Sequence, residues 1–248
     1  MKIGIKKSGI IIIGNEILNG KTIEKNSNFL CKKLSDRGIE VKEIVIIPDE
    51  KENIIEKVNS FRKKFEYVFT TGGIGPTHDD ITSESIAEAL NVRLELNLHA
   101  KKILKEHYSD EAFTKARLKM AYLPKNASLI DNPVSIAPGF FLENVYVFPG
   151  VPKILEIMFV EFIKTLEKGK KKFQVMLSTI LSEGLIGEFI GQIQKQNLNV
   201  EIGSYPYFKK KSFGVTLVIR GYDKRSIDNV AKKIFDYVKL KKGKPKLF

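Results

Sequence analysis

The amino-acid sequence predicts an α/β protein: a three-layer α-β-α domain on a mainly parallel sheet, followed by a smaller α+β domain. From Ser8 onward, short β-branched runs alternate with amphipathic helical stretches. A glycine- and lysine-rich stretch at 168–172 interrupts this periodicity. With 248 residues, 43% of them hydrophobic, the chain can form one large core and one small core. We therefore expect domains at residues 1–168 and 169–248.

The first third of the chain predicts two β-α-β units. Strands are expected at 9–13, 41–47 and 67–70. The helix between the first two covers 27–37, with Gly38 as its stop signal. The next helix follows Asp49, and Glu52 three residues later suggests a capping box. Right-handed crossovers would place both helices against the sheet.

The remaining elements follow from the same patterns. The large domain is expected to add a helix at 82–90, a less regular helical region at 98–122, a hairpin of strands 140–142 and 145–148, and a helix opening at Val151-Pro152. The small domain is expected to contain strand 173–179, helix 183–196, strands 200–205 and 213–220, and helix 225–239. This β-α-β-β-α order predicts a compact α+β unit.

Charge is concentrated near the C-terminus. The net charge is +13, and residues 209–248 hold thirteen Lys or Arg against three Asp. The lysines after residue 238 have no aromatic residues between them on which bases could stack, so we expect a solvated basic tail and regard nucleic-acid binding as unlikely. Such a tail should be dispensable.

The sequence indicates a cytoplasmic protein without a membrane segment. Its single cysteine, Cys31, cannot form an internal disulfide, which fits a reducing compartment. No apolar run approaches the roughly 20 residues of a membrane helix. The N-terminal segment has no apolar region or cleavage site of a signal peptide.

The segment 70–82 carries the clearest chemical signal. It lies between a predicted strand and a predicted helix, where an open α/β sheet binds its ligands. Gly72, Gly73 and Gly75 would allow backbone N–H groups to approach a bound group, and the helix N-terminus would favour a phosphate. The glycine spacing matches neither the dinucleotide fingerprint nor the Walker loop, which disfavours NAD enzymes and P-loop ATPases.

Two carboxylates follow the glycines. Asp79 and Asp80 would repel a bare phosphate, whereas Mg²⁺ binds one or two carboxylates together with phosphate oxygens and water. The pair therefore predicts a divalent-metal site that bridges the protein to a diphosphate. The alternative for Asp80 is a capping role at the helix that begins near Thr82.

Several ordered motifs resemble those of one known family. They are Gly14-Asn15-Glu16-Ile17-Leu18-Asn19-Gly20, Asn26-Ser27-Asn28, the loop 71–82, Leu123-Pro124, Asn132-Pro133-Val134, Ala137-Pro138-Gly139-Phe140 and Phe148-Pro149-Gly150-Val151-Pro152. Over about residues 8–165 the chain resembles the molybdopterin-binding (MoaB/Mog-like) family, in the form that opens the competence/damage-inducible CinA proteins. Residues 173–240 resemble the small domain that follows in those proteins.

The resemblance implies a function. It implies binding of a nucleotide or pterin such as molybdopterin and, for CinA-type members, metal-dependent hydrolysis of a nucleotide diphosphate such as ADP-ribose. Asn15 stands where the family usually has Thr or Asp. CinA proteins continue into a nicotinamide-mononucleotide deamidase domain, and nothing after Lys239 resembles it, so we expect no amidase activity. Many relatives self-associate, which suggests a homo-oligomer.

The candidate residues form two groups. Asp79, Asp80 and Glu16 are candidates for catalysis, the first two as metal ligands. The candidates for ligand or phosphate binding are Gly72, Gly73, Gly75, Thr77, His78, Thr82, Asn28, Asn132, Pro149 and Gly150.

Each candidate has a structural alternative. His78 can be an exposed loop residue, Glu16 a surface residue at a helix start, and the two asparagines caps or turn residues. Pro149 and Gly150 can simply shape a loop. The competing functions are a metal-dependent hydrolase, a non-catalytic nucleotide or molybdopterin binder and, more weakly, a nucleic-acid-associated competence factor.

Overall fold

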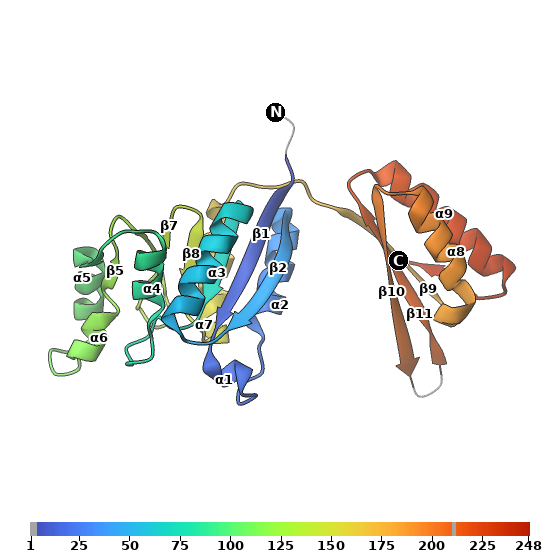
Figure 1. Ribbon diagram of the computed structural model, residues 1–248. Coiled ribbons are helices and arrows are strands. Elements are labelled where there is room, and N and C mark those ends of the chain that lie inside the picture. The colour runs from blue at the N-terminus through green and yellow to red at the C-terminus, as the bar shows by residue number, and fades with distance from the viewer. Residues whose placement is uncertain (1–3, 210–211) are drawn as a thin grey trace. The chain divides into compact units, whose positions relative to one another are not determined.

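The computed structural model describes residues 4–209 and 212–248 (Figure 1). Residues 1–3, which belong to the N-terminal segment assessed for a signal peptide, lie outside this range. The chain divides into two compact units, Met1–Gly169 and Lys170–Phe248, here called unit 1 and unit 2. This division falls one residue beyond the expected boundary. None of the helices described is long and apolar enough to cross a membrane.

Unit 1 is built on a six-stranded sheet. Its strands, in spatial order, are β2 (Ile39–Ile47), β1 (Lys6–Ile13), β3 (Tyr67–Thr71), β8 (Val145–Phe148), β7 (Gly139–Leu142) and β6 (Ser128–Ile130). The first four pair in parallel, and β7 runs antiparallel to both of its neighbours. The predicted mainly parallel sheet and the predicted β7–β8 hairpin are therefore confirmed.

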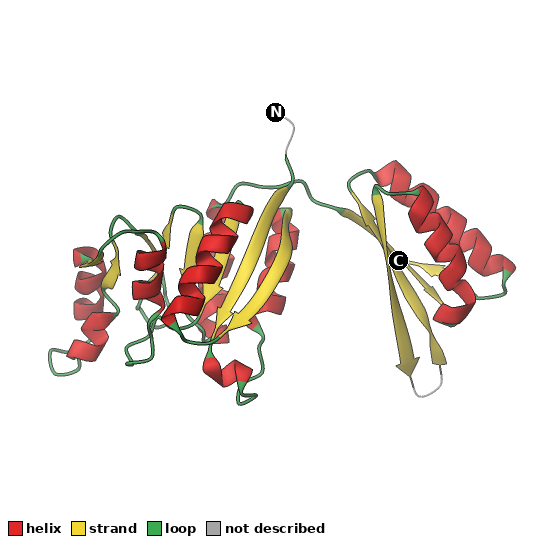
Figure 2. Cartoon of the chain, viewed as in Figure 1, coloured by secondary structure: helices red, strands yellow, loops and turns green. Residues whose placement is uncertain are grey.

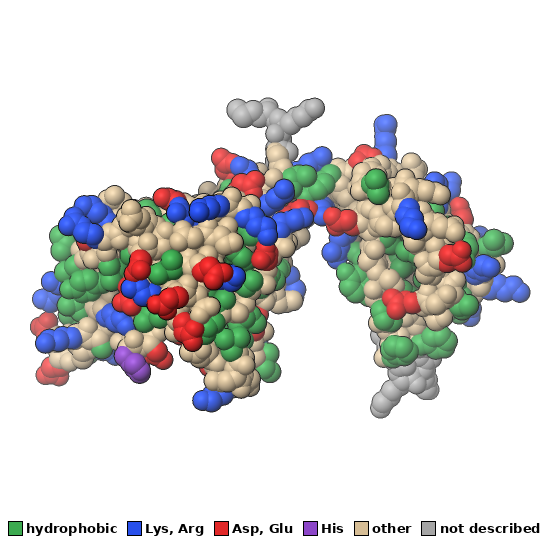
Figure 3. Space-filling view, in the orientation of Figure 1, with side chains coloured by type: hydrophobic (Ala, Val, Ile, Leu, Met, Phe, Trp, Pro, Cys, Tyr) green, Lys and Arg blue, Asp and Glu red, His purple; other side chains and the backbone are tan. Residues whose placement is uncertain are grey.

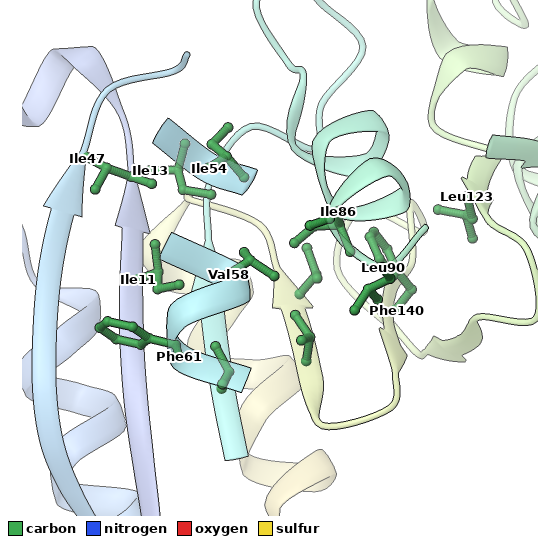
Figure 4. Close-up of a cluster of buried hydrophobic side chains, with 14 of the residues drawn as sticks. Ile11, Ile13, Ile47, Ile54, Val58, Phe61, Ile86, Leu90, Leu123 and Phe140 are labelled. Atoms are coloured by element: carbon green, nitrogen blue, oxygen red, sulfur yellow. The ribbon is translucent and has the colours of Figure 1, made fainter. Parts of the chain in front are cut away.

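Helices cover both faces of this sheet (Figure 2). One face carries α3 (Lys51–Lys64) and α4 (Thr82–Ala89), and the other carries α2 (Asn26–Arg37) and α7 (Pro152–Phe162), which a 3₁₀ turn (Ile163–Thr165) extends. Alternation along β1 supplies both cores: Ile10 and Ile12 pack on one side, Ile11 and Ile13 on the other (Figure 4). The three-layer prediction is confirmed.

A small lobe lies beyond α4. Strands β4 (Leu94–Leu96) and β5 (Tyr122–Pro124) pair antiparallel, and α5 (Leu98–His107) and α6 (Lys115–Lys119) lie between them in the chain. The expected irregular helical region is thus two separate helices. Each begins at a side-chain cap: Asn97 accepts from the N–H of Ala100, and Thr114 accepts from the N–H of Arg117.

Helix α3 begins differently from the sequence prediction. Its N-cap is Glu50, and no side chain caps it. Asp49 instead accepts the backbone N–H of Asn15 at 2.7 Å, at the start of the short helix α1 (Asn15–Leu18). The predicted capping box is wrong because this long-range donor takes the carboxylate. The predicted stop of α2 is confirmed: Gly38 is left-handed, with φ of 81°.

Unit 2 has its own core. Its elements are β9 (Phe173–Thr179), α8 (Glu183–Gln196), β10 (Val200–Lys209), β11 (Ser212–Gly221), α9 (Lys224–Leu240) and β12 (Lys246–Leu247). The antiparallel sheet has the order β10-β11-β9-β12, and both helices pack on the same face. The β-α-β-β-α-β succession is that of a split β-α-β fold.

The sequence predicted a solvated basic tail, but the structure shows that part of the tail is docked on unit 2. Lys246 and Leu247 form β12 against β9. The carbonyl of Gly243 accepts hydrogen bonds from the Thr179 hydroxyl at 2.7 Å and from the N–H of Ile180 at 3.0 Å. The lysine side chains remain exposed while the backbone docks. A strand of two residues has no periodicity that the sequence could reveal.

Candidate functional site

The candidate site lies at the carboxyl ends of the parallel strands of unit 1. In Figure 1 this is the end of the sheet next to α1. Four connections begin there. They are Gly14 with the short helix α1 after β1, and the loops 48–50 after β2, 72–81 after β3 and 149–151 after β8. Open α/β sheets bind ligands at this edge. The topology therefore brings together most of the residues that the sequence selected.

Two glycines in the β3–α4 loop are required by close packing. Gly72 has φ of 106°, and a Cβ there would lie 2.1 Å from the carbonyl oxygen of Ile13. Gly73 has φ of 67°, and its Cβ would lie 2.3 Å from Oγ1 of Thr82. Thr82 is fully buried, and its hydroxyl donates to the carbonyl of Gly72 at 2.9 Å. These three residues hold the shape of the loop.

Asp80 shapes the turn before α4. Its Oδ2 accepts the N–H of Thr77 at 2.8 Å and the Thr77 hydroxyl at 2.5 Å. The N-cap of α4 is Ile81, and no side chain caps the helix, so the alternative capping role of Asp80 is wrong. A Cβ at Gly75 would lie 2.7 Å from the same carboxylate oxygen. Gly75 thus makes room for Asp80.

Asp79 and His78 project from this loop. The Asp79 side chain is 68% exposed and that of His78 is 98% exposed. The polar groups of Thr77 and of the Asp79 backbone beside this carboxylate hold the pKa of Asp79 below its usual range. The exposure of His78 supports its alternative as a surface residue. Asp79 is open to a cation from solvent.

A shallow cavity adjoins the loop. Asp80 and Gly75 line it on one side, Glu84 of α4 contributes a second carboxylate, and Lys119 and Tyr122 line it from the lobe. The Lys119 ammonium donates to the carbonyl of Thr77 at 2.6 Å. Asp80 therefore stands between the strand-end crevice and a cavity with mixed charge and one aromatic ring.

Two further carboxylates approach from neighbouring loops. Glu16 lies over Gly14, whose Cβ would be 2.7 Å from the Glu16 carboxylate. Asp49 has one oxygen on the N–H of Asn15 and the other 3.6 Å from the Cβ position of Gly73. Asp49 was not predicted as a site residue from the sequence. It follows the end of a parallel strand, however, and a position after a parallel strand was the reason for selecting Glu16.

The surface beside this edge is also acidic. Asp and Glu side chains gather over α3 and α4 on the viewed face of unit 1 (Figure 3). Lys51 compensates part of this charge through an ion pair with Glu88 at 2.5 Å. An anionic ligand approaching from this side would meet unfavourable charge unless a cation accompanied it.

Asn26, not Asn28, lies inside the site. Its amide nitrogen donates to the carbonyl of Gly150 at 2.8 Å and to the Thr71 hydroxyl at 3.2 Å. Asn26 is 4% exposed, and its carbonyl oxygen is buried without a partner, as is the hydroxyl of Thr70. Asn28 is exposed on the outer side of α2. Helical periodicity could have distinguished them, because Asn26, Leu30 and Leu34 share the buried face.

Asn132 is fully used within its own turn. Its amide donates to the Ser135 hydroxyl and the Ala137 carbonyl, and its oxygen accepts from the N–H groups of Val134 and Ser135. This geometry favours the turn alternative over base or pterin binding. Pro149 and Gly150 lie in the loop after β8, where a Cβ at Gly150 would lie 3.2 Å from Cα of Gly72.

The carboxylates do not form a ready-made cage for a metal. Across residues 4–209 and 212–248, no group of three or more His, Cys, Asp or Glu is placed to hold an ion. This donor set does not fit zinc, which takes three or four protein ligands. It fits Mg²⁺, a hard cation that uses one or two carboxylates and completes its shell with water and phosphate.

A mainly parallel sheet with helices on both faces and a glycine-rich loop at its strand ends defines an open three-layer α/β domain, a class in which the ligand site lies at the carboxyl ends of the strands. Residues 9–168 match the family described as probable molybdopterin binding domain, and residues 171–244 match the FAD synthase middle domain. The chain belongs to the molybdopterin-binding domain family.

Similar proteins include both short and long chains. A protein of Archaeoglobus fulgidus is 35% identical, and the match covers 90% of this chain and 94% of the relative. A CinA-like protein of Fusobacterium nucleatum is 30% identical (94% and 58% covered), and a probable FAD synthase of Caenorhabditis briggsae is 32% identical (91% and 48% covered). The chain thus spans about half the length of these last two.

A solved structure also resembles unit 1. The protein CinA from Thermoplasma acidophilum aligns with a TM-score of 0.62 and 32% sequence identity. The alignment covers 64% of this chain and 96% of that chain. The resemblance to CinA-type proteins found in the sequence is therefore confirmed, and the three-layer fold is shared with a solved structure.

Proposed function

We propose that the strand-end crevice binds a nucleotide diphosphate such as ADP-ribose and hydrolyses it with a divalent cation. One observation carries the proposal: carboxylates that follow three neighbouring parallel strands, those of Glu16, Asp49 and Asp80, lie at the same edge of the sheet as the glycine-rich loop. Ligands of open α/β sheets occupy this edge, and carboxylates beside a phosphate imply an intervening cation.

Each part of the site has a role in this proposal. Asp79 and Asp80 would hold the cation, which supplies charge neutralisation and lowers the pKa of bound water. Thr77 donates two hydrogen bonds to the Asp80 carboxylate, so this metal-binding group is held in position before a ligand arrives. Asp49 and Glu16 would orient a water molecule and accept its proton. The backbone of the loop would bind the diphosphate, with Pro149 and Gly150 forming the opposite wall.

The second candidate is binding without hydrolysis, of a nucleotide or of molybdopterin. The match of residues 9–168 to the family described as probable molybdopterin binding domain favours this reading.

The test combines turnover with binding. A panel of nucleoside diphosphate compounds is assayed with Mg²⁺ and with EDTA, together with thermal-shift measurements that include pterins. Metal-dependent cleavage of the diphosphate bond, which releases two monophosphate products, supports the hydrolase. Stabilisation without turnover over the whole panel supports the binder and refutes hydrolysis.

Asp80→Asn is the decisive variant. The amide oxygen can still accept from Thr77, so the melting temperature should stay close to that of the wild type. Turnover should fall by about a hundredfold or more, because the charge that holds the cation is lost. Asp110→Asn, an exposed carboxylate elsewhere in unit 1, is the matched control and should keep full activity. Equal activity of both variants would remove Asp80 from the site.

A further inference from the structure

The sheet of unit 2 has one covered face and one open face. Leu177, Leu217 and Ile219 point into the core beneath α8 and α9. Because side chains alternate along a strand, their neighbours point away from the helices. Among the residues described, the outer face holds Met176, Tyr205, Val218, Arg220, Lys246 and Phe248, and the register also places Gln174, Ser178, Glu201, Tyr207 and Thr216 on it.

The centre of the outer face is apolar and flanked by two aromatic rings. Met176 and Val218 are cross-strand neighbours. Tyr205 is 50% exposed, and its ring lies across Gly203, where a Cβ would be 2.8 Å from the ring. Phe248 is 71% exposed and exchanges two backbone hydrogen bonds with Met176, at 2.9 and 3.3 Å. Three strand spacings place the two rings roughly 14 Å apart.

The charge of unit 2 is strongly positive. Residues 170–248 contain seventeen Lys or Arg and six Asp or Glu, so this unit carries +11 of the net +13. Arg220 and Lys246 lie on the outer face itself. At its margin Lys172 pairs with Glu201 at 2.7 Å and lies 5.4 Å from the ring centroid of Tyr222. A positively charged surface with exposed aromatic rings suits a polyanion that also carries flat apolar groups.

We propose that the outer face of unit 2 binds single-stranded nucleic acid. Unpaired bases would stack on Tyr205 and Phe248, and Arg220 and Lys246 would contact the phosphates between them. A duplex fits less well, because its bases are already stacked on one another. From the sequence, nucleic-acid binding was unlikely because the lysines of the basic tail have no aromatic residues between them on which bases could stack. In the folded unit, however, Phe248 lies beside β9, and Tyr205 lies on the same face of the sheet.

The test is fluorescence anisotropy on the full chain. Labelled oligo(U) and oligo(dT) of about twelve nucleotides and a duplex of equal length are titrated at ~50 and ~200 mM NaCl. Tighter binding of either single strand than of the duplex is expected, and the two single strands show which sugar is preferred. No binding of single strands at low salt, or equal binding of the duplex, would overturn the proposal.

Matched variants separate stacking from general charge. Tyr205→Ala should weaken single-strand binding about tenfold, and Tyr205→Phe should retain it. Phe208→Ala is the control, because Phe208 is an exposed aromatic on the same strand with the opposite alternation. Lys246→Gln should lower the salt slope by roughly 0.7, whereas Lys233→Gln, on the exposed side of α9, should not.

The same variants reveal a competing occupant. Equal affinities of Tyr205→Ala and Phe208→Ala would refute the stacking platform. Loss of a dimer in Tyr205→Ala by sedimentation, with nucleic-acid binding unchanged, would assign the outer face to a second copy of the chain. Asp80→Asn should bind oligonucleotide as the wild type does, so this proposal and that for the crevice fail independently.

Discussion

Asn26 shows how one buried amide can join two loops of the crevice. Its nitrogen bonds to the loop after β8 and to the end of β3, while its oxygen is buried without a partner. Removing such a side chain leaves buried polar groups unsatisfied, which costs more than the bonds themselves contribute.

Asn26→Ala should therefore lower the free energy of unfolding by about 1–3 kcal/mol, because the Gly150 carbonyl and the Thr71 hydroxyl lose their donor. Urea denaturation measures the change. Asn28→Ala, two residues later and exposed, should alter stability by less than about 0.5 kcal/mol. Similar losses for both variants would show that Asn26 acts only through helix propensity.

Gly73 and Gly14 make a second residue-scale pair. Gly73→Ala should destabilise the chain by about 2–4 kcal/mol, because a side chain is strained at φ of 67° and displaces the Thr82 hydroxyl. Gly14 has extended backbone, and its Cβ would meet only the flexible Glu16 carboxylate, so Gly14→Ala should cost less than about 1 kcal/mol.

Thermal melts compare the two variants, and activity assays show whether displacing Glu16 matters. A Gly73 variant as stable as the wild type would mean that the loop can take another conformation.

At the scale of elements, the sequence predicted those with a strong period. The buried run Ile10–Ile13 predicted β1, and Ile54, Val58 and Phe61 predicted the buried stripe of α3. The strands missed were β4, β5, β6 and β12, which have two or three residues each and form only because a neighbouring strand is present. Strand order depends on contacts distant in sequence, which periodicity does not encode.

The candidate site, too, has local features that the sequence predicted and long-range features that it did not. Glycine spacing and adjacent carboxylates are local features, and they were enough to locate the β3–α4 loop from the sequence alone. Asp49 was taken for a helix cap, because its partner, the N–H of Asn15, is 34 residues away. Helical periodicity places Asn26 on the buried face of α2 and leaves Asn28 exposed, and ligand binding by Asn28 stays a prediction. What the sequence could not show was which side chains converge from different loops.

The tail gives a prediction for an element. Truncation after Lys239 removes β12 and Gly243, so the Thr179 hydroxyl and the edge of β9 lose their partners. We expect unit 2 to lose about 1–3 kcal/mol of stability, measured by urea denaturation followed by circular dichroism. Lys241→Gln combined with Lys242→Gln keeps the backbone and should leave stability within about 0.5 kcal/mol. A fully stable truncation would restore the view of a dispensable tail.

The whole molecule combines two chemically different units. Unit 1 carries the carboxylate-rich crevice and only +2 of the net charge, whereas unit 2 carries a basic, open sheet face. No residue of the unit 2 core belongs to either core cluster of unit 1. Each core is complete within its own segment, which is the physical condition for independent folding.

Residues 1–169 and 170–248, produced separately, should therefore each unfold cooperatively with a midpoint within a few degrees of the corresponding transition in the full chain. Differential scanning calorimetry provides the measurement. The first fragment should retain metal-dependent ligand behaviour, because every crevice residue from Glu16 to Gly150 lies within it. If it folds but loses that behaviour, unit 2 contributes to the site. If either fragment fails to unfold cooperatively, its core depends on the other unit, and the separation of the two hydrophobic clusters does not extend to their stability.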